Sequence, residues 1–219
     1  MSIKDKYTVQ SIDTEETKEW FLYKHYAHRI PNSIYTFGLY ENCILQGVIS
    51  FGMMANNNLN EFIEGYDCIE LNRLIINDNM PRNSLSYFVS QSLKLIPRPK
   101  VIISYADNGH GHHGHIYQAT NWIYTGMGKG DYGFIKNGRQ YHRKSLFNLY
   151  GTGALENAVA NGYEVIKVVP KHRYIYLHGT KYQIKDMKAK MPFKQEPYPK
   201  GDNQRYDASY KPTIQQKLF

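Results

Sequence analysis

The sequence predicts a mixed α/β fold whose central sheet is mostly antiparallel and carries crossover helices on its faces. Three observations lead to this prediction. Residues 35–52 have the pattern of a hairpin, residues 68–123 alternate strand, helix, strand and helix, and Asn137-Gly138 is a strong signal for a second hairpin. With 219 residues, the chain is long enough to bury a sizeable core without disulfides.

In chain order, the first hairpin is expected to turn at the polar pair Glu41-Asn42, between two β-prone runs. The run CIELNRLIIN, residues 68–77, then alternates as a strand does, with one polar side at its centre. This alternation places four residues on one side of the strand: Ile69, Leu71, Arg73 and Ile75. The other side is expected to carry Cys68, Glu70, Asn72 and Leu74.

Apolar residues next recur at helical spacing from Leu85 to Ile96, behind a possible cap at Asn83 or Ser84. The apolar run VIISYAD, residues 101–107, is typical of a strand buried on both faces in a parallel pair. A second helix is expected after it, with one face made by Ile116, Ala119 and Ile123.

The C-terminal part has a different composition. Residues 164–180 predict either a pair of strands or one strand and its extension, and residues 191–219 resemble an extended tail rich in Pro, Tyr and Lys. We therefore expect a domain over residues 1–180, followed by a basic, Tyr- and Pro-rich extension over residues 181–219.

Positive charge is concentrated in this second part. Residues 1–135 contain 11 Lys+Arg and 13 Asp+Glu, whereas residues 136–219 contain 16 and 6, so the net charge of +8 arises entirely there. Tyrosines are interleaved with the charges, as in residues 171–185. Lys and Arg suit phosphates and Tyr rings suit unstacked bases, so the pattern favours nucleic acid over anionic lipid. An ordinary solvated basic surface is the alternative.

Other partners and compartments are disfavoured. No apolar run approaches the length of a membrane span, no leader pattern stands at residues 1–10, and only Cys43 and Cys68 are present. The sequence therefore predicts a soluble protein in a reducing compartment, with no membrane contact.

Function in such sheets tends to lie at the carboxyl ends of parallel strands, here the loops after Ile76 and Ala106. In the first loop, Arg82 and the start of a helix favour an anion, although an ordinary capped helix would have the same sequence. In the second, Tyr105 and Asp107 end the strand, and a run of histidines follows: His110, His112, His113 and His115.

Two uses of this second loop remain open. Asp107 and imidazoles such as that of His112 can bind a divalent metal such as iron or zinc. Alternatively, one histidine acts as an acid or base while the others are solvated, which the absence of HExxH or paired CxxC spacing favours.

Two more polar clusters are candidates. His25 and His28 are spaced to share a helical face, although structural histidines are commoner there. On the strand, Glu70, Asn72 and Arg73 indicate a lined cleft, or a buried Glu that simply pairs with an arginine.

Two long motifs carry a family resemblance. ELNRLIINDNMPRNSLSYFVSQSL (70–93) and, after it, ISYADNGHGHHGHIYQATNWIYTG (103–126) resemble the Mom-like phage DNA-modification proteins, which are similar to acyltransferases of the GCN5-related fold. FGLYENCILQGVISFG before them and KHRYIY after them extend the resemblance to about residues 25–177. It implies a phage-encoded transferase in the host cytoplasm that alters the exocyclic amine of adenine in DNA. The implied product is a carbamoylmethyl adduct that blocks restriction endonucleases.

The resemblance also implies roles for individual residues. A coenzyme A thioester, such as acetyl-CoA, would be bound through its pyrophosphate and neighbouring groups by Arg82, Asn83, Ser84, Leu85, Ser86 and Asn121. Its pantetheine arm would pass between splayed strands, with Tyr117 near the thioester sulfur. Asp107 and His112 match the family's "D…GH" positions and are candidates for acid/base work or for a metal.

In the resulting hypothesis, double-stranded DNA lies on the basic surface, adenine is flipped into the cleft, and Asp107 or His112 accepts the amine proton. Tyr105 and Asn72 complete the predicted catalytic set. The predicted substrate-binding residues are His28, Glu70, Arg73, Lys171, Arg173 and Tyr174. The alternatives are an N-acetyltransferase acting on a protein or small-molecule amine, and a non-catalytic DNA-binding anti-restriction factor.

The last five residues, QQKLF, resemble a peptide that binds the bacterial sliding clamp. In such a peptide, Gln215, Leu218 and Phe219 would contact an apolar pocket.

Overall fold

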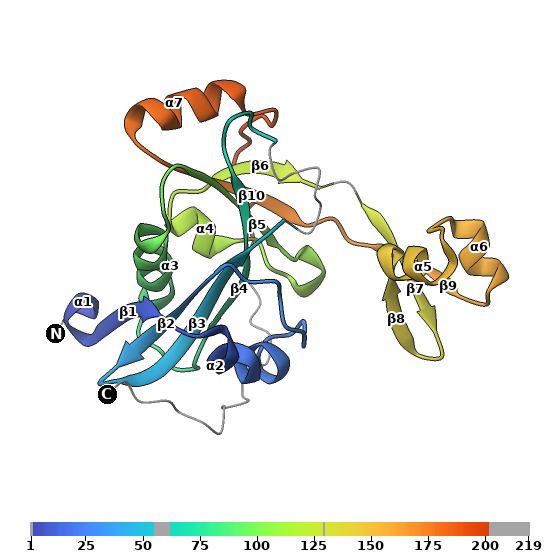
Figure 1. Ribbon diagram of the computed structural model, residues 1–219, viewed down its shortest axis with the longest axis horizontal. Helices are drawn as coiled ribbons and strands as arrows, with labels where there is room; N and C mark the ends of the chain where they lie inside the picture. Colours follow the sequence, from blue (N-terminus) through green and yellow to red (C-terminus); the bar gives the residue numbers. More distant parts are fainter. Residues whose placement is uncertain (1, 55–61, 129, 202–219) are drawn as a thin grey trace.

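The computed structural model describes residues 2–54, 62–128 and 130–201 of the chain. Its main part is a seven-stranded sheet in the order β1-β2-β3-β4-β5-β10-β6 (Figure 1), in which only β4 and β5 are parallel. The strands are β1 (Tyr7–Ser11), β2 (Tyr35–Glu41), β3 (Ile44–Gly52), β4 (Cys68–Ile76), β5 (Lys100–Ala106), β6 (Ile123–Met127) and β10 (His172–His178). The predicted mixed, mostly antiparallel sheet is confirmed.

Helices cover both faces of this sheet (Figure 1). On the first face, Phe88 and Val89 of α3 (Ser84–Leu95) and Tyr117 of α4 (His115–Ala119) pack into the main apolar core. The second face has two separate covers. The helix α2 (Thr14–Glu19) and the π-helix η1 (Trp20–Lys24) cover it near β1–β3. The helix α7 (Lys181–Lys190) covers it near β5 and β10. A short helix, α1 (Ile3–Lys6), precedes β1.

An extra residue in β4 changes which side chains share a face. The pairing with β3 shifts between Ser50↔Arg73 and Phe51↔Leu71, so that Asn72 forms a β-bulge. Ile69 and Leu71 therefore pack in the core under α3, whereas Ile75 packs in the core under η1. The predicted strict alternation of β4 is wrong beyond Leu71, because the bulge turns Arg73 and Ile75 to the second face.

One predicted boundary also differs. The helix expected over Ile116, Ala119 and Ile123 ends at Ala119, and Ile123 begins β6. The chain turns at Asn121, whose φ is +62°, and the amide of Trp122 donates to the carbonyl of Tyr117. The tail predicted to be extended is preceded by a helix, α7, whose Thr180–Gln183 capping box is present in the sequence as T-x-x-Q.

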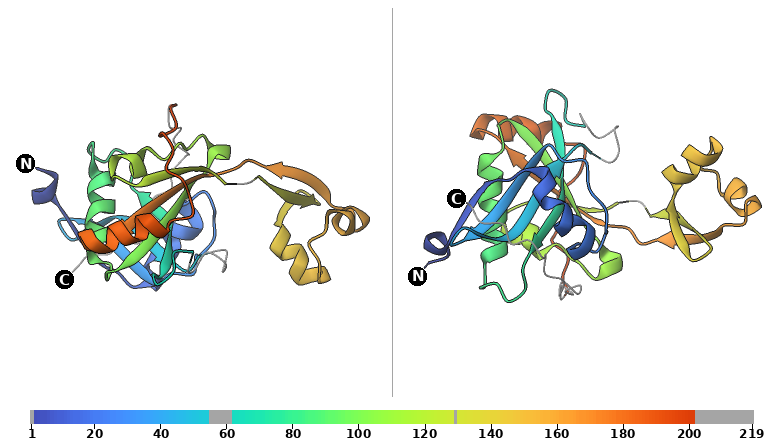
Figure 2. Two further views of the ribbon diagram at one scale, coloured as in Figure 1. Left: turned by 90° about the horizontal axis from the view of Figure 1, so that it is seen from above. Right: turned by 60° about the horizontal axis from the view of Figure 1, so that its bottom comes forward.

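A second unit, called the arm below, comprises residues 131–168 and projects from the main sheet (Figures 1 and 2). The arm contains β7 (Asp131–Lys136), β8 (Arg139–His142), α5 (Arg143–Tyr150), α6 (Leu155–Ala160) and β9 (Glu164–Val168). Its three strands form a separate sheet in the order β8-β7-β9. The hairpin predicted at Asn137-Gly138 is confirmed, with φ of +51° and +72° at these residues.

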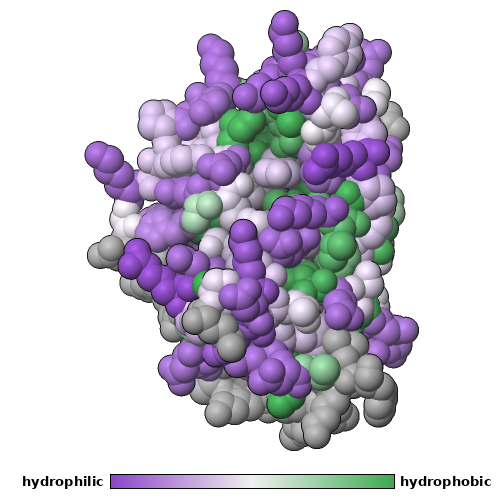
Figure 3. Space-filling model, turned by 90° about the vertical axis from the view of Figure 1, so that its left-hand side faces the viewer, coloured by the Kyte–Doolittle hydropathy of each residue, from purple (hydrophilic) through white to green (hydrophobic). Residues whose placement is uncertain are grey.

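The arm has its own small core, made by Phe134, Leu146, Ala158 and Tyr163. Residues 164–180 do form two strands, but β9 belongs to the arm and β10 to the main sheet. The face of the molecule turned away from the arm is mostly hydrophilic, with apolar patches between the polar side chains (Figure 3). No helix among the described residues has the length and apolar character needed to cross a membrane. Gln215, Leu218 and Phe219 lie outside the described residues.

Candidate active site

The candidate site lies where β4 and β5 separate, on the second face between η1 and α7. The two strands pair only over Cys68↔Val101, Ile69↔Ile102 and Glu70↔Ile103, and then diverge. On this face, η1 packs on one side of the divergence and α7 packs on the other. The strand ends that lie between these two helices carry polar rather than apolar residues.

Glu70, Arg73 and Tyr105 lie near one another in this gap. The sequence had grouped Glu70 and Arg73 with Asn72 in a lined cleft, which stays a prediction. Burial lowers the pKa of Arg73, and the charge of Glu70 raises this pKa part of the way back. Burial also raises the pKa of the Tyr105 hydroxyl, and Glu70 raises it further. Arg73 is held by two backbone carbonyls, donating from Nη1 to Asn72 (2.6 Å) and from Nη2 to Arg29 (3.3 Å). The guanidinium is therefore fixed beside the opening of the sheet.

The opening itself is bridged by two hydroxyl groups. Ser104 Oγ lies 2.9 Å from the carbonyl oxygen of Leu71 on β4 and 2.7 Å from the Tyr117 hydroxyl. Complete burial raises the pKa of Tyr117 well above its usual value, and the charges of Tyr26 and Glu70 raise it further. Tyr117 is thus protonated at neutral pH, and its hydroxyl reaches the splay from the side of α4.

Asp107, at the end of β5, is held on both sides. Its Oδ1 accepts from the amide of Gly109 (3.0 Å), which caps the 3-10 turn η3 (Asn108–His110), and its Oδ2 forms an ion pair with Lys171 Nζ (2.7 Å). Burial alone would raise the pKa of Asp107, but the ion pair and the amide together hold it below the usual value. Asp107 is therefore an ionised anchor that joins the histidine loop to the start of β10.

His112 packs in a cluster of rings around Tyr26. The Tyr26 ring lies 4.4 Å from that of His25, 4.6 Å from that of His110 and 5.8 Å from that of His112, centroid to centroid. Burial and the neighbouring His110 lower the pKa of His112, so its imidazole is neutral at pH 7. Burial, followed by the charge of Asp107, raises the pKa of Tyr26.

Tyr26 was not among the site residues predicted from the sequence. Its signal was present, because it stands between two histidines in a segment expected to approach the sheet. The histidines themselves have structural contacts. His25 Nδ1 is the acceptor for the amide of Ala27, and burial, with the charge of Arg73, lowers the His25 pKa to about 3. His28 Nδ1 lies 2.8 Å from the carbonyl oxygen of Leu22. The shared helical face predicted for His25 and His28 is wrong, because η1 ends at Lys24 and the chain turns at His28, where φ is +43°.

Several other predicted residues are engaged in holding the fold. The Asn72 amide donates to the carbonyl of Asn32 (3.1 Å) and accepts from Ser50 Oγ, so it ties the segment before β2 to the bulge. These contacts give Asn72 a part in holding the bulge, and its predicted catalytic role stays a prediction. Tyr174 is fully buried and hydrogen-bonds to the carbonyl of His113. Its ring packs so closely on Gly114 that a Cβ there would lie 2.4 Å from it, so it cannot stack on a base.

Arg173 is also fixed within the protein. Its Nη2 donates to the carbonyl oxygen of Thr125 (2.9 Å), its Nε donates to the Thr125 hydroxyl (2.8 Å), and the guanidinium lies 3.5 Å from the centroid of the Phe193 ring. Lys171 is paired with Asp107. Lys171 and Arg173 therefore both have partners within the protein, and their contact with DNA stays a prediction.

The start of α3 fits an anionic group of a cofactor. Asn83 adopts a left-handed conformation (φ +71°), which makes the tight turn that glycine usually makes, and Arg82 beside it is exposed. The first turn of α3 contains no acidic residue, so its amide dipoles favour an anion. The buried Ser84 hydroxyl has no hydrogen-bond partner among the described residues.

The remaining predicted cofactor residues are placed as follows. Leu85 and Ser86 occupy the first turn of α3, where Ser86 Oγ donates to the carbonyl of Asn83 (3.0 Å). Asn121 lies on the exposed turn between α4 and β6. For a metal the structure gives no support. Within residues 2–54, 62–128 and 130–201, no group of three or more His, Cys, Asp or Glu side chains is arranged to hold an ion, and Asp107 is committed to Lys171.

The model of the Mom protein family matches residues 6–200. The chain is 30% identical over 189 residues to the methylcarbamoylase mom of Escherichia phage Mu, covering 81% of this chain and 77% of that protein.

Solved structures show weaker likeness. An acetyltransferase of the GNAT family from Bacillus cereus is 14% identical, with a TM-score of 0.43, over 78% of this chain and 96% of that one. A putative acetyltransferase from Salmonella typhimurium, determined with acetyl-CoA, is 8% identical, with a TM-score of 0.44, over 78% and 93%.

Proposed function

The chain belongs to the Mom protein family and is a transferase by that membership, and we propose that its acceptor is the exocyclic amine of adenine in DNA. The product we propose is a carbamoylmethyl-type adduct that protects phage DNA from host restriction endonucleases. The observation that carries the proposal is the splayed β4–β5 pair, lined by Glu70, Arg73 and Tyr105, in a chain 30% identical to a methylcarbamoylase.

His112 is the proposed general base. When the adenine amine forms its new bond to carbon, it must lose a proton, and a neutral imidazole can take it. The lowered pKa of His112 leaves the imidazole unprotonated at neutral pH. Asp107 is less suited to this step, because its ion pair with Lys171 stabilises the charged form and lowers its basicity.

Tyr117 is the proposed proton donor: it would protonate the thiolate released from a coenzyme A thioester. Its raised pKa keeps the hydroxyl protonated, and that hydroxyl lies in the opening between the strands. The exocyclic amine of adenine is inaccessible in a stacked duplex, so the base must be flipped out before it can react. We assign the ring of Tyr26, with its neighbours His110 and His112, as the surface that receives the flipped base.

A coenzyme A thioester would be held by Arg82 and the first turn of α3. Transfer of its acyl group to the amine would give an N-acyl adenine and a free thiol, so a carbamoylmethyl adduct requires a further step or another donor. The exposed guanidinium of Arg82 and the partnerless Ser84 hydroxyl are the chain's own groups for the phosphates of coenzyme A.

The proposal is tested by mass spectrometry of nucleosides from a host that expresses the chain. We expect a modified adenine with the wild type, and its loss with His112→Asn. The matched control is His115→Asn, which changes an exposed histidine of the same loop and should leave the adduct level unchanged. Soluble wild-type protein with wholly unmodified adenine would refute the proposal.

A further inference from the structure

The arm leaves the main sheet at the same end as the candidate active site. His172, the first residue of β10, pairs with Ala106, the last residue of β5, and with Met127, the last residue of β6. The arm is inserted in the chain between β6 and β10, so it starts where the histidine loop starts (Figure 1). DNA bound at the site would therefore run close to the base of the arm.

The other basic element, α7, lies at the opposite end. His178, the last residue of β10, pairs with Lys100, the first residue of β5, and α7 follows directly. The positive charge of the C-terminal part is thus divided between two places. The arm itself, residues 131–168, contains five Lys+Arg and three Asp+Glu, a net charge of +2.

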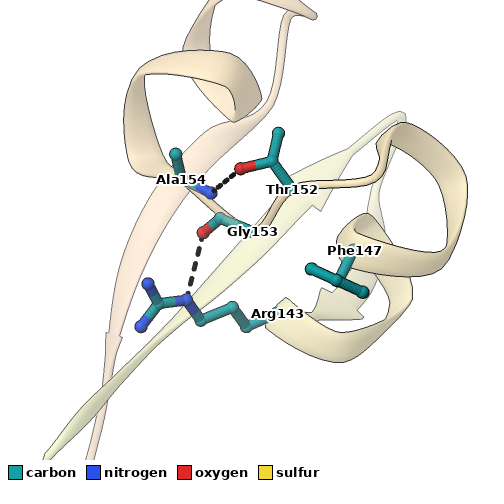
Figure 4. Close-up of a pocket in the computed structure, with 5 residues that line it drawn as sticks. All are labelled: Arg143, Phe147, Thr152, Gly153 and Ala154. Atoms are coloured by element: carbon teal, nitrogen blue, oxygen red, sulfur yellow. Dashed lines mark hydrogen bonds between the residues drawn. The ribbon is translucent and has the colours of Figure 1, made fainter.

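A hollow of about 480 Å³ opens on the arm between α5 and the loop before α6. It is lined by Arg143, Phe147, Thr152, Gly153 and Ala154 (Figure 4). Arg143 Nε donates to the carbonyl of Gly153 (3.1 Å), which fixes the guanidinium, while its two terminal nitrogens point away from that carbonyl (Figure 4). Those two nitrogens have no hydrogen-bond partner in the part of the chain that the structure describes.

An apolar ring accompanies this guanidinium. Phe147 lies one helical turn after Arg143 on α5, and 58% of its surface is exposed. An exposed aromatic ring beside an arginine fork fits a partner that offers paired acceptor atoms next to an apolar surface. Duplex DNA offers both, as phosphate oxygens or the O6 and N7 atoms of guanine beside sugars and base edges.

We propose that this hollow is a second DNA-contact site, remote from the catalytic residues, in which Arg143 binds acceptor atoms of the duplex and Phe147 packs against its sugar or base surface. The inference rests on the proposed function, since it takes the DNA substrate as the ligand. The arm then binds the duplex next to the adenine that is flipped out, while the residues between β4 and β5 bind that adenine.

Binding of a fluorescent duplex of random sequence to the full chain, followed by anisotropy without any donor, tests the proposal. Arg143→Ala should weaken binding about tenfold, as expected for loss of one charged DNA contact. Phe147→Ala, at an exposed position, should weaken it in the same direction. The matched control is Lys185→Gln on α7, which removes one positive charge from an exposed residue at the other end of the sheet and should leave affinity within about twofold.

Two further readouts identify the atoms bound. If Arg143 contacts a phosphate, the slope of log affinity against log salt falls by about one in Arg143→Ala. If it contacts guanine, the slope is kept and the variant loses a preference for guanine in a random duplex pool. Either result supports the proposal.

Wild-type affinity in both Arg143→Ala and Phe147→Ala overturns the proposal, provided that both variants melt at the wild-type temperature. A change of oligomeric state in these variants, with DNA affinity unchanged, also overturns it and assigns the hollow to a contact between copies of the chain. These results are independent of adduct formation. A chain that binds DNA through Arg143 but modifies no adenine leaves this inference standing and refutes the proposed function alone.

Discussion

Removing the Lys171 ammonium should destabilise the histidine loop in a way that depends on pH. Lys171 is the ion-pair partner of Asp107, whose side chain is only 14% exposed, whereas that of Lys171 is 44% exposed. Because the pair is partly solvated, we expect Lys171→Met to cost about 1 kcal/mol of folding stability, at the upper end for exposed pairs. For a chain of this length, that corresponds to a fall of roughly 2–4 °C in melting temperature at neutral pH.

The pH dependence gives the sharper test. The folded-state pKa of Asp107 lies below its unfolded value of about 3.8, so the pair contributes stability above that value. The contribution is lost as the pH falls through the lowered folded-state pKa, where Asp107 becomes protonated. The melting temperatures of wild type and Lys171→Met should therefore differ at neutral pH and converge in acid. Lys94→Met, which removes an exposed lysine whose neighbour is the amide Gln91, is the control. A difference that persists unchanged in acid would refute the ion-pair explanation.

Three further predictions concern the site and the C-terminal residues. The rate of adenine modification should rise with pH as His112 deprotonates, with a midpoint below the ordinary value of 6.5, and a flat profile would exclude His112 as the base. Tyr117→Phe should abolish the adduct while costing only about 1 kcal/mol in denaturant unfolding, since one hydrogen bond to Ser104 is lost, and a fully active variant would remove Tyr117 from the reaction. Deletion of residues 215–219 should abolish capture by the bacterial sliding clamp without changing activity on naked DNA, and undiminished capture would reject the clamp motif.

The order of strands and helices could be predicted from the sequence, because hydrophobic periodicity and turn residues specify it locally. Asn137-Gly138 defined a hairpin, and the apolar run at residues 101–107 defined the buried parallel strand. The bulge at Asn72 could not be predicted in this way. The bulge depends on how Ser50 and Phe51 of β3 pair with β4, which is a contact between separate segments of the chain. The alternation of apolar and polar residues along β4 does not show where one extra residue is inserted.

This bulge determines part of the site. Without it, Glu70 and Arg73, three residues apart, would face opposite sides of the sheet, and the predicted cleft could contain only one of them. With it, both face the gap between η1 and α7. The same limit applies to Tyr174, which stands in a basic, aromatic run and yet is fully buried, because its position on β10 turns it toward α4. Composition predicts what a segment can bind, whereas strand register decides which of its side chains can reach the ligand.

The histidine loop shows how these limits combine. Its four imidazoles suggest a metal by composition, but Asp107 is paired with Lys171, and the rings of His110 and His112 pack around Tyr26. His113 instead lies against His172, with ring centroids 5.5 Å apart. The loop is thereby divided into a part that packs on Tyr26 and a part that packs on His172 of the main sheet. In the proposed function, the first part receives the base, and the neutral imidazole of His112 takes a proton from its amine.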